Sequence, residues 1–205
     1  RIQINLLKNS EEKYQLLLRE KEEFLLSLED ESSKNLQDVI DDINAAALHI
    51  QEIEEVLQEA EPALHYLNET FNQLQSAESW GTFDMIGGGL LVTSIKHGKI
   101  DEARLGISKA QFYLDNLSHE LRDVVLPTQL NESIDIGDFD SFGDYIFDGL
   151  IFDFIVQEKI SKSRSHVQSV YLQVSTIEHM LKNQLQELQN AIKAKMQQKL
   201  QLLKN

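Results

Sequence analysis

A regular pattern of apolar residues runs from Leu36 to Leu74. The apolar positions alternate between steps of three and four residues: Leu36, Val39, Ile43, Ala46, Ile50, Ile53, Leu57, Ala60, Leu64, Leu67, Phe71 and Leu74. Most positions between them are Gln, Asp, Glu or Asn. This spacing is typical of a helix whose apolar seam packs against another helix in a coiled coil. Pro62 lies off the seam, so we expect a kink there and not a helix end.

A similar stripe occupies the N-terminal segment. It consists of Leu7, Tyr14, Leu18, Leu25 and Leu28. The step from the last of these to Leu36 is eight residues and crosses the polar run 31–35. Such a step shifts the phase of the stripe, and we expect it to bend the helix or change its supercoil. The pattern therefore predicts one helix over residues 1–78.

The C-terminal third carries a second long stripe, formed by Ile160, Val167, Val170, Val174, Ile177, Leu181, Leu185, Leu188, Ile192 and Leu203. Its helix is expected to begin near Asp140 or Ser141, because either is a good N-cap. Residues 142–156 are apolar on nearly all sides and should be buried. Charge favours antiparallel pairing with the first helix, because residues 20–31 are strongly acidic and only Lys residues carry charge after Glu187.

The segment between the two long helices is expected to form a small helical head. Residues 83–97 are predicted to form a short apolar helix that ends at Gly98, which would act as a left-handed C-cap. Asp101 would then cap a helix running to about Val125. Residues 128–140 are predicted to be a polar, acidic loop.

The predicted fold class is therefore all-α. Residues 1–78 and 142–205 would form a long antiparallel coiled-coil hairpin, with residues 79–141 as a small helical head inserted between them. A two-helix hairpin of this length leaves apolar flanking residues, among them Leu17, Phe24, Ile40 and Val56. Covering them in a dimer would build a four-helix stem, so we expect a homo-oligomer, most simply a dimer.

Composition and charge exclude several classes of function. The chain has 34 acidic and 19 basic residues, a net charge of −15, which would repel the phosphates of nucleic acid. It contains no Cys, which excludes disulfides, thiolate metal sites and cysteine nucleophiles. No signal peptide and no run of about 20 apolar residues are visible, so we expect a cytoplasmic protein and no membrane association. Because the chain begins with Arg1, we expect it to be a fragment or a processed form.

The least ordinary segment is 79–89, which contains Trp80 and three consecutive glycines. A phosphate-binding loop would need Lys and then Ser or Thr after the last glycine, whereas two leucines follow here. We therefore expect close helix packing, with the head held together by Trp80, Gly87, Gly88, Gly89, Phe147 and Phe152. The alternative is a membrane-active or pore-forming protein that inserts residues 85–95.

Acidic residues form the other candidate site. Asp140, Asp144 and Asp148 recur at every fourth position, which places three carboxylates on one face of a helix. Together with His97 they could bind a divalent cation, so a metal-dependent enzyme that uses them is the second alternative function. We favour the interpretation that they stabilise the start of the long helix. We therefore expect no metal and no cofactor. No catalytic signature such as Gly-x-Ser-x-Gly or His-Glu-x-x-His occurs, so we expect no enzyme activity.

Three segments of the middle third resemble a family of uncharacterised bacterial coiled-coil proteins: Ser79–Gly89, Lys96–Ala103 and Phe142–Phe154. The resemblance implies a helical head flanked by a tryptophan-glycine segment and an aspartate-aromatic block. That family has no assigned activity, so the resemblance assigns no functional residues to this chain. Together these observations predict a non-enzymatic scaffold or adaptor, which presents helical surfaces to protein partners whose identity the sequence does not give.

Overall fold

The structure is a computed structural model. It describes residues 2–28, 30–84, 90–124, 139, 141–142 and 157–204.

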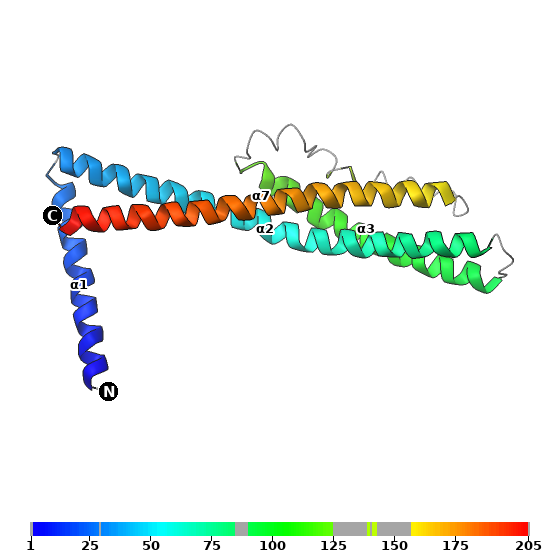
Figure 1. Cartoon of the computed structure of the whole chain (residues 1–205), viewed down its shortest axis with the longest axis horizontal. Helices are drawn as coiled ribbons and strands as arrows, with labels where there is room; N and C mark the ends of the chain where they lie inside the picture. Colours follow the sequence, from blue (N-terminus) through cyan, green and yellow to red (C-terminus); the bar gives the residue numbers. More distant parts are fainter. Residues whose placement is uncertain are drawn as a thin grey trace. The chain divides into compact units, whose positions relative to one another are not determined.

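All regular secondary structure among the described residues is helical, which confirms the all-α class (Figure 1). The helices are α1 (Ile2–Leu26), α2 (Glu31–Asp84), α3 (Leu90–Leu121) and α7 (Gln157–Lys204). No helix in the described part of the chain has an apolar stretch long enough to cross a membrane.

The chain divides into two compact units, and each contains parts of α2 and α7. Unit 1 consists of Arg1–Gln51 and Gln186–Asn205. Unit 2 consists of Glu52–Leu185.

The prediction of one helix over residues 1–78 is wrong, because α1 and α2 are separated by a capped break. Asp30 caps α2: the backbone N–H of Ser33 donates to its Oδ1 at 2.8 Å, and that of Lys34 donates to its backbone oxygen at 3.1 Å. The Ser33 hydroxyl donates to the Leu26 carbonyl at 3.1 Å, which ties the end of α1 to the start of α2. The eight-residue step in the apolar stripe predicted the position of the irregularity correctly. The sequence predicted a bend there, whereas the N-cap ends one helix and begins another.

The prediction of a helix end at Gly98 is also wrong. α3 passes through this residue without interruption and ends at Leu121, four residues before the expected end at Val125. A glycine inside a helix costs only about 1 kcal/mol relative to alanine. One glycine therefore does not end a helix that residues on both sides continue. α2 likewise continues through Pro62, as expected, and it ends at Asp84.

In unit 2, α2 is buried along two rows of residues and not along one. The first row, part of the predicted seam, consists of Ile53, Ala60, Leu67 and Leu74. The second consists of Val56, Ala63, Thr70 and Ala77. All eight side chains have an exposed fraction of 0 %. The other seam residues in this stretch, Leu57, Leu64 and Phe71, are only half-buried.

The second row faces α3. The Tyr66 ring stacks on Tyr113 of α3, with centroids 5.6 Å apart and planes at 11°. Asn116 of α3 donates to a carboxylate oxygen of Glu59 at 3.1 Å. Residues 59, 63, 66 and 70 lie on one side of a helix with 3.6 residues per turn, so these contacts place α3 over the second row. Val56 is thus covered by α3 of its own chain and needs no dimer.

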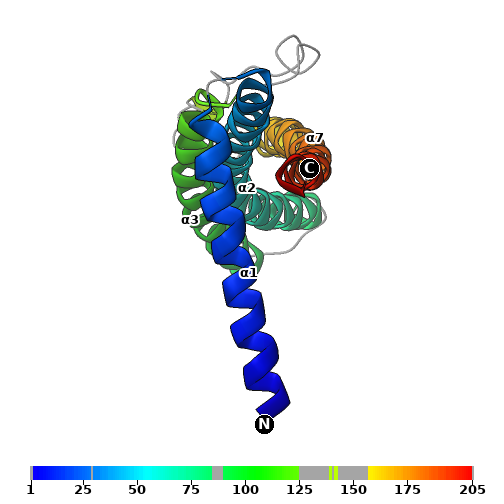
Figure 2. The same ribbon diagram turned by 90° about the vertical axis from the view of Figure 1, so that its left-hand side faces the viewer.

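α7 packs on another side of α2. The Arg164 guanidinium lies 3.2 Å from the Glu78 carboxylate and 5.8 Å from the centre of the Phe71 ring. Further along, Asn68 of α2 lines a groove together with Leu172 of α7. Residue numbers rise along α2 as they fall along α7, so the two helices are antiparallel in unit 2. In the end-on view, α3 and α7 lie at different positions around α2 (Figure 2).

Two phenylalanines connect α3 to α7 in unit 2. Gln111 of α3 donates to the backbone carbonyl of Phe139 at 3.0 Å. The ring of Phe142 stacks on His166 of α7, with centroids 5.8 Å apart. Both phenylalanines have an exposed fraction of 0 %. The expected burial of Phe142 is confirmed.

Unit 1 is held by fewer buried residues and by ion pairs. Leu36, Val39 and Leu203 are its buried apolar side chains among the described residues. The Lys195 ammonium lies 2.6 Å from the Asp42 carboxylate, and the Lys199 ammonium lies 2.7 Å from Glu22. The second pair joins α1 to α7 and brings an acidic residue of the 20–31 segment to the Lys-rich C-terminus.

The close approach of α3 to α2 yields a first prediction. A Cβ placed on Gly106 would lie 2.6 Å from Thr70 Oγ1, which is buried and makes no hydrogen bond. We expect Gly106→Ala to lower the free energy of unfolding by roughly 1–2 kcal/mol, because overpacking outweighs the gain in helix propensity. Urea unfolding followed by circular dichroism measures this.

The matched control removes the obstructing hydroxyl. In the Thr70→Ala background, the same Gly106→Ala change should cost nothing or stabilise the protein, because the hydroxyl that the new methyl would meet is gone. Equal losses in both backgrounds would contradict a direct contact between the two residues.

The capped break yields a second prediction. Asp30→Ala removes the acceptor of the Ser33 N–H bond and should lower the free energy of unfolding by about 1 kcal/mol. Asp30→Asn should retain most of the stability, because the amide oxygen can accept the same bond. Thermal unfolding of the two variants distinguishes a cap from a simple charge effect.

Candidate interaction surfaces

Exposed apolar residues form a stripe on α1 in unit 1, and we call it the α1 stripe. It consists of Tyr14, Leu17 and Phe24, continued by Leu28 just beyond the helix end, with exposed fractions of 43 %, 62 %, 62 % and 45 %. Steps of three, seven and four residues place these side chains on one face. Lys21 occupies the middle position of the stripe.

A neighbouring side of α1, about 120° around the helix, contacts α7. Leu18 is half-buried there. The N-terminal stripe expected from the sequence is therefore divided, because Leu18 packs while Tyr14 and Leu28 are exposed. A groove of about 290 Å³ between the two helices is lined by Gln15, Leu18, Arg19, Glu22, Met196, Lys199, Leu200 and Leu203. α1 is therefore held to the unit by one face, while its apolar stripe points to solvent.

The segment of the chain that carries the α1 stripe is acidic. Residues 10–31 contain eight acidic and three basic residues, a net charge of −5. One of the acids, Glu22, is paired with Lys199. The stripe thus consists of exposed aromatic and aliphatic side chains carried by an acidic segment of the chain.

A second surface lies between α2 and α7 in unit 2, and we call it the α2–α7 groove. It has a volume of about 170 Å³ and is lined by Asn68, Phe71, Gln168, Tyr171 and Leu172. Leu172 is 57 % exposed, and the two aromatic residues are half-buried. The groove presents an apolar floor with amide groups at its edges.

The residues that line the α2–α7 groove are uncharged, and the paired Arg164 and Glu78 lie beside Phe71 at one end. Residues 165–177 of α7 contain no Asp, Glu, Lys or Arg, although 26 % of the whole chain is charged. On α2, residues 62–77 contain only Glu69, which lies about 160° around the helix from Phe71. Charged residues are depleted at the centres of protein interfaces.

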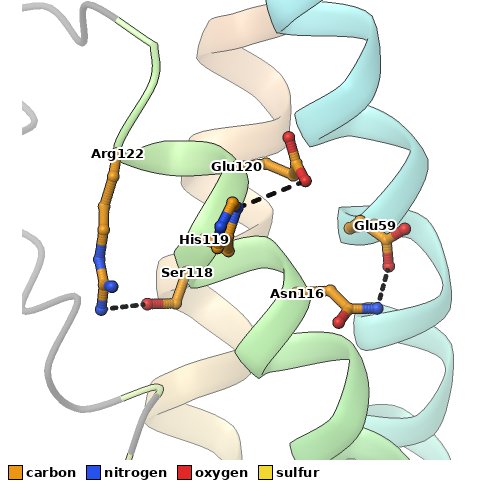
Figure 3. A network of polar contacts seen from close by, with 6 residues as sticks. All are labelled: Glu59, Asn116, Ser118, His119, Glu120 and Arg122. Atoms are coloured by element: carbon orange, nitrogen blue, oxygen red, sulfur yellow. Dashed lines mark hydrogen bonds and ion pairs between the residues drawn. The ribbon is translucent and has the colours of Figure 1, made fainter.

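A third group of polar residues lies near the end of α3 (Figure 3). Asn116 reaches across to Glu59 of α2, and Arg122 donates to the Ser118 hydroxyl at 3.3 Å. The His119 ring lies 3.7 Å from the Glu120 carboxylate. The Asn116–Glu59 bond joins α3 to α2, whereas the other two contacts lie within the C-terminal end of α3 and the residues just after it.

His119, Glu120 and Asp123 bring three possible metal ligands together. Their ligand atoms all lie within 4.8 Å of one another. His119 is 74 % exposed, and Asp123 is also exposed. Good metal sites hold their ligands with further hydrogen bonds in a sheltered setting, so these exposed groups by themselves carry no functional conclusion.

The predicted site residues fall outside the part of the chain whose side chains the structure describes. Asp140, Asp144, Asp148, Gly87, Gly88, Gly89, Phe147 and Phe152 lie outside the described residues. Trp80 and His97 belong to the backbones of α2 and α3, and their side chains also lie outside the described part. The packing of the head and the possible cation site therefore stay predictions.

Sequence reasoning missed the α2–α7 groove and the second buried row of α2. The row was visible as a series of seven-residue steps through Val56, Ala63, Thr70 and Ala77. Its small and polar members obscured it. The groove was visible as the long uncharged stretch of α7. The α1 stripe was partly foreseen, because Leu17 and Phe24 were expected to be exposed flanks.

We also compared the chain with known proteins. No family model, no curated protein and no solved structure matched it. Its function must therefore be inferred from its own residues.

Proposed function

We propose that this chain is a non-enzymatic structural or protein-interaction protein. It acts as a scaffold or adaptor by presenting helical surfaces, and it works as a homo-oligomer. The observation that carries the proposal is the α1 stripe. Leu17 and Phe24, seven residues apart on one face, are each 62 % exposed.

The physical argument is the cost of leaving such a face in water. Burying a leucine or phenylalanine side chain contributes about 1.5–3 kcal/mol. Contiguous exposed apolar residues with a polar rim mark binding sites more often than single exposed residues do. A stripe with helical spacing fits a partner helix laid along it, which is a common mode of recognition.

Charge defines the partner further. Residues 10–31 carry a net charge of −5, so an acidic partner helix would be repelled. A helix with an apolar face and lysine or arginine at its flanks would gain both apolar contact and charge complementarity. The proposed partner of the α1 stripe is therefore a basic amphipathic helix.

We further propose that α2 and α7 pair as an antiparallel hairpin over their whole length. The Glu78–Arg164 pair in unit 2 and the Asp42–Lys195 pair in unit 1 support this arrangement. Continuous pairing would give the scaffold a stiff body from which α1 can be presented.

A distance measurement tests the end of the hairpin that lies in unit 1. The chain has no Cys, so Leu28→Cys and Leu200→Cys together provide two clean attachment points for spin labels. The hairpin predicts a distance of a few helix turns, whereas an extended chain would separate the labels by several times more, since a helix rises about 1.5 Å per residue. Electron double resonance distinguishes the two, and a long distance would refute the hairpin.

The α1 stripe is tested with a defined probe. We expect a synthetic helix of about 21 residues, with leucine on one face and lysine at its flanks, to bind the full chain. Leu17→Gln/Phe24→Gln should weaken its binding at least about tenfold, because two apolar anchors are lost. Leu105→Gln is the matched control, since Leu105 is similarly exposed on α3 at 60 %. Fluorescence anisotropy gives the dissociation constants.

Two outcomes would contradict this use of the stripe. One is equal binding by the double variant and the wild type. The probe would then bind through nonspecific attraction between its lysines and the acidic chain, and not through the stripe. The other is equal binding of a probe with glutamate in place of lysine, which would remove the inferred charge preference.

A further inference from the structure

The outer face of α7 in unit 2 carries an unusual set of residues. Steps of three and four place seven of them on one face: Ser161, Ser165, Gln168, Leu172, Ser175, His179 and Asn183. None is acidic, and none is Lys or Arg. Five are exposed, and Ser161 and Ser175 are half-buried. Leu172 stands at the middle of this uncharged face and borders the α2–α7 groove.

Charge restricts where two copies of this chain can meet. Each copy has a net charge of −15, so most relative orientations bring like charges together. A two-fold symmetric contact uses the same patch on both copies, and each charged residue in it would therefore face a copy of the same patch. An uncharged patch avoids this repulsion. It also avoids the cost of removing charged groups from water.

We propose that a second copy of this chain docks on this face, with the two α7 helices antiparallel about a two-fold axis at Leu172. The inference deepens the proposed function, because it rests on the homo-oligomer and assigns its interface. Residues at equal distances from Leu172 then face each other. Ser165 meets His179, and Ser161 meets Asn183.

These pairings are chemically compatible. Each joins two uncharged groups that can exchange a hydrogen bond, and at the centre Leu172 meets its own copy. The α2–α7 groove lies beside this point with a volume of about 170 Å³. A cavity of about 150 Å³ holds a benzene molecule, so the groove is large enough for the leucine side chain of the other copy.

The charges that border the face are already paired within each copy. At one end, Arg164 lies 3.2 Å from Glu78. At the other, Lys182 lies 2.8 Å from Glu178. The ends of the contact are therefore locally neutral and add little repulsion.

The α1 stripe is the weaker candidate for self-association. A two-fold contact along it would bring two segments of net charge −5 together. It would also place Lys21 of both copies at the centre of an apolar contact, which requires costly desolvation. The two surfaces thus bind different partners. The α1 stripe binds a basic helix, and the uncharged outer face of α7 binds a second copy of the chain.

Sedimentation of the full chain tests the proposal. We expect a dimer at concentrations on the order of tens to hundreds of micromolar, strengthened by salt, which screens the net repulsion of the two copies. Leu172→Glu should weaken dimerisation at least about tenfold, because it places two carboxylates at the axis. Leu105→Glu on α3, at a similarly exposed position, should leave it unchanged. Circular dichroism checks that both variants stay folded.

Cross-linking locates the axis independently. Because the chain has no Cys, Leu172→Cys creates a single thiol that sits next to its copy in the proposed dimer. A short bismaleimide should link most of this variant into covalent dimers. Leu105→Cys should give few or none at the same concentration.

The outcomes separate this inference from the proposed function. A wild type that stays monomeric at all these concentrations would overturn the inference and the homo-oligomer together, and leave the binding of the α1 stripe to its own test. A dimer that survives Leu172→Glu and is broken by Leu17→Gln/Phe24→Gln would overturn the inference alone. In that case the α1 stripe, and not α7, would be the interface between copies.

Discussion

The organisation of unit 2 depends on the double width of the buried face of α2. One helix partner can cover one row of apolar residues, but α2 buries Ile53, Ala60, Leu67 and Leu74 together with Val56, Ala63, Thr70 and Ala77. Two rows require two partner helices, and α7 and α3 supply them. Alanine, threonine and glycine at the α2–α3 contact let the backbones approach closely. At Gly106 the approach is so close that a Cβ would lie 2.6 Å from Thr70 Oγ1. The result is a packed set of three helices with one uncharged groove between α2 and α7.

The two candidate interaction surfaces are helix faces that no other helix of the chain covers among the described residues. α1 is separated from α2 by the Asp30 cap and meets α7 through one face only, so its other face stays exposed with Leu17 and Phe24 upon it. α7 is covered on its inner side, while its outer side is uncharged over residues 165–177. In a chain of net charge −15, both features favour association: the first with a basic helix, the second with an identical copy.

Part of the fold could be predicted from the sequence. The three- and four-residue steps identified the helical class and most of α2 and α7, because helix periodicity is a local property of the chain. The same reasoning misplaced several helix boundaries, two of them for clear physical reasons. The break at Asp30 depends on a cap that competes with a continuing stripe, and Gly98 has a propensity cost too small to end α3. The candidate site residues between 85 and 156 lie mostly outside the described residues, so the structure leaves those predictions as they were.

The sequence by itself determined the helical periodicity, the absence of cysteine chemistry and the acidic charge, because each is a property of residue order or composition. Only the tertiary structure decided which apolar rows are covered by the chain's own helices. Val56 and Phe24 both appeared as flanks of a seam, yet Val56 lies buried under α3 and Phe24 lies in solvent. The difference comes from contacts between residues far apart in the chain, such as Glu59 with Asn116 and Glu22 with Lys199. Periodicity within one helix carries no information about which distant helix will cover it.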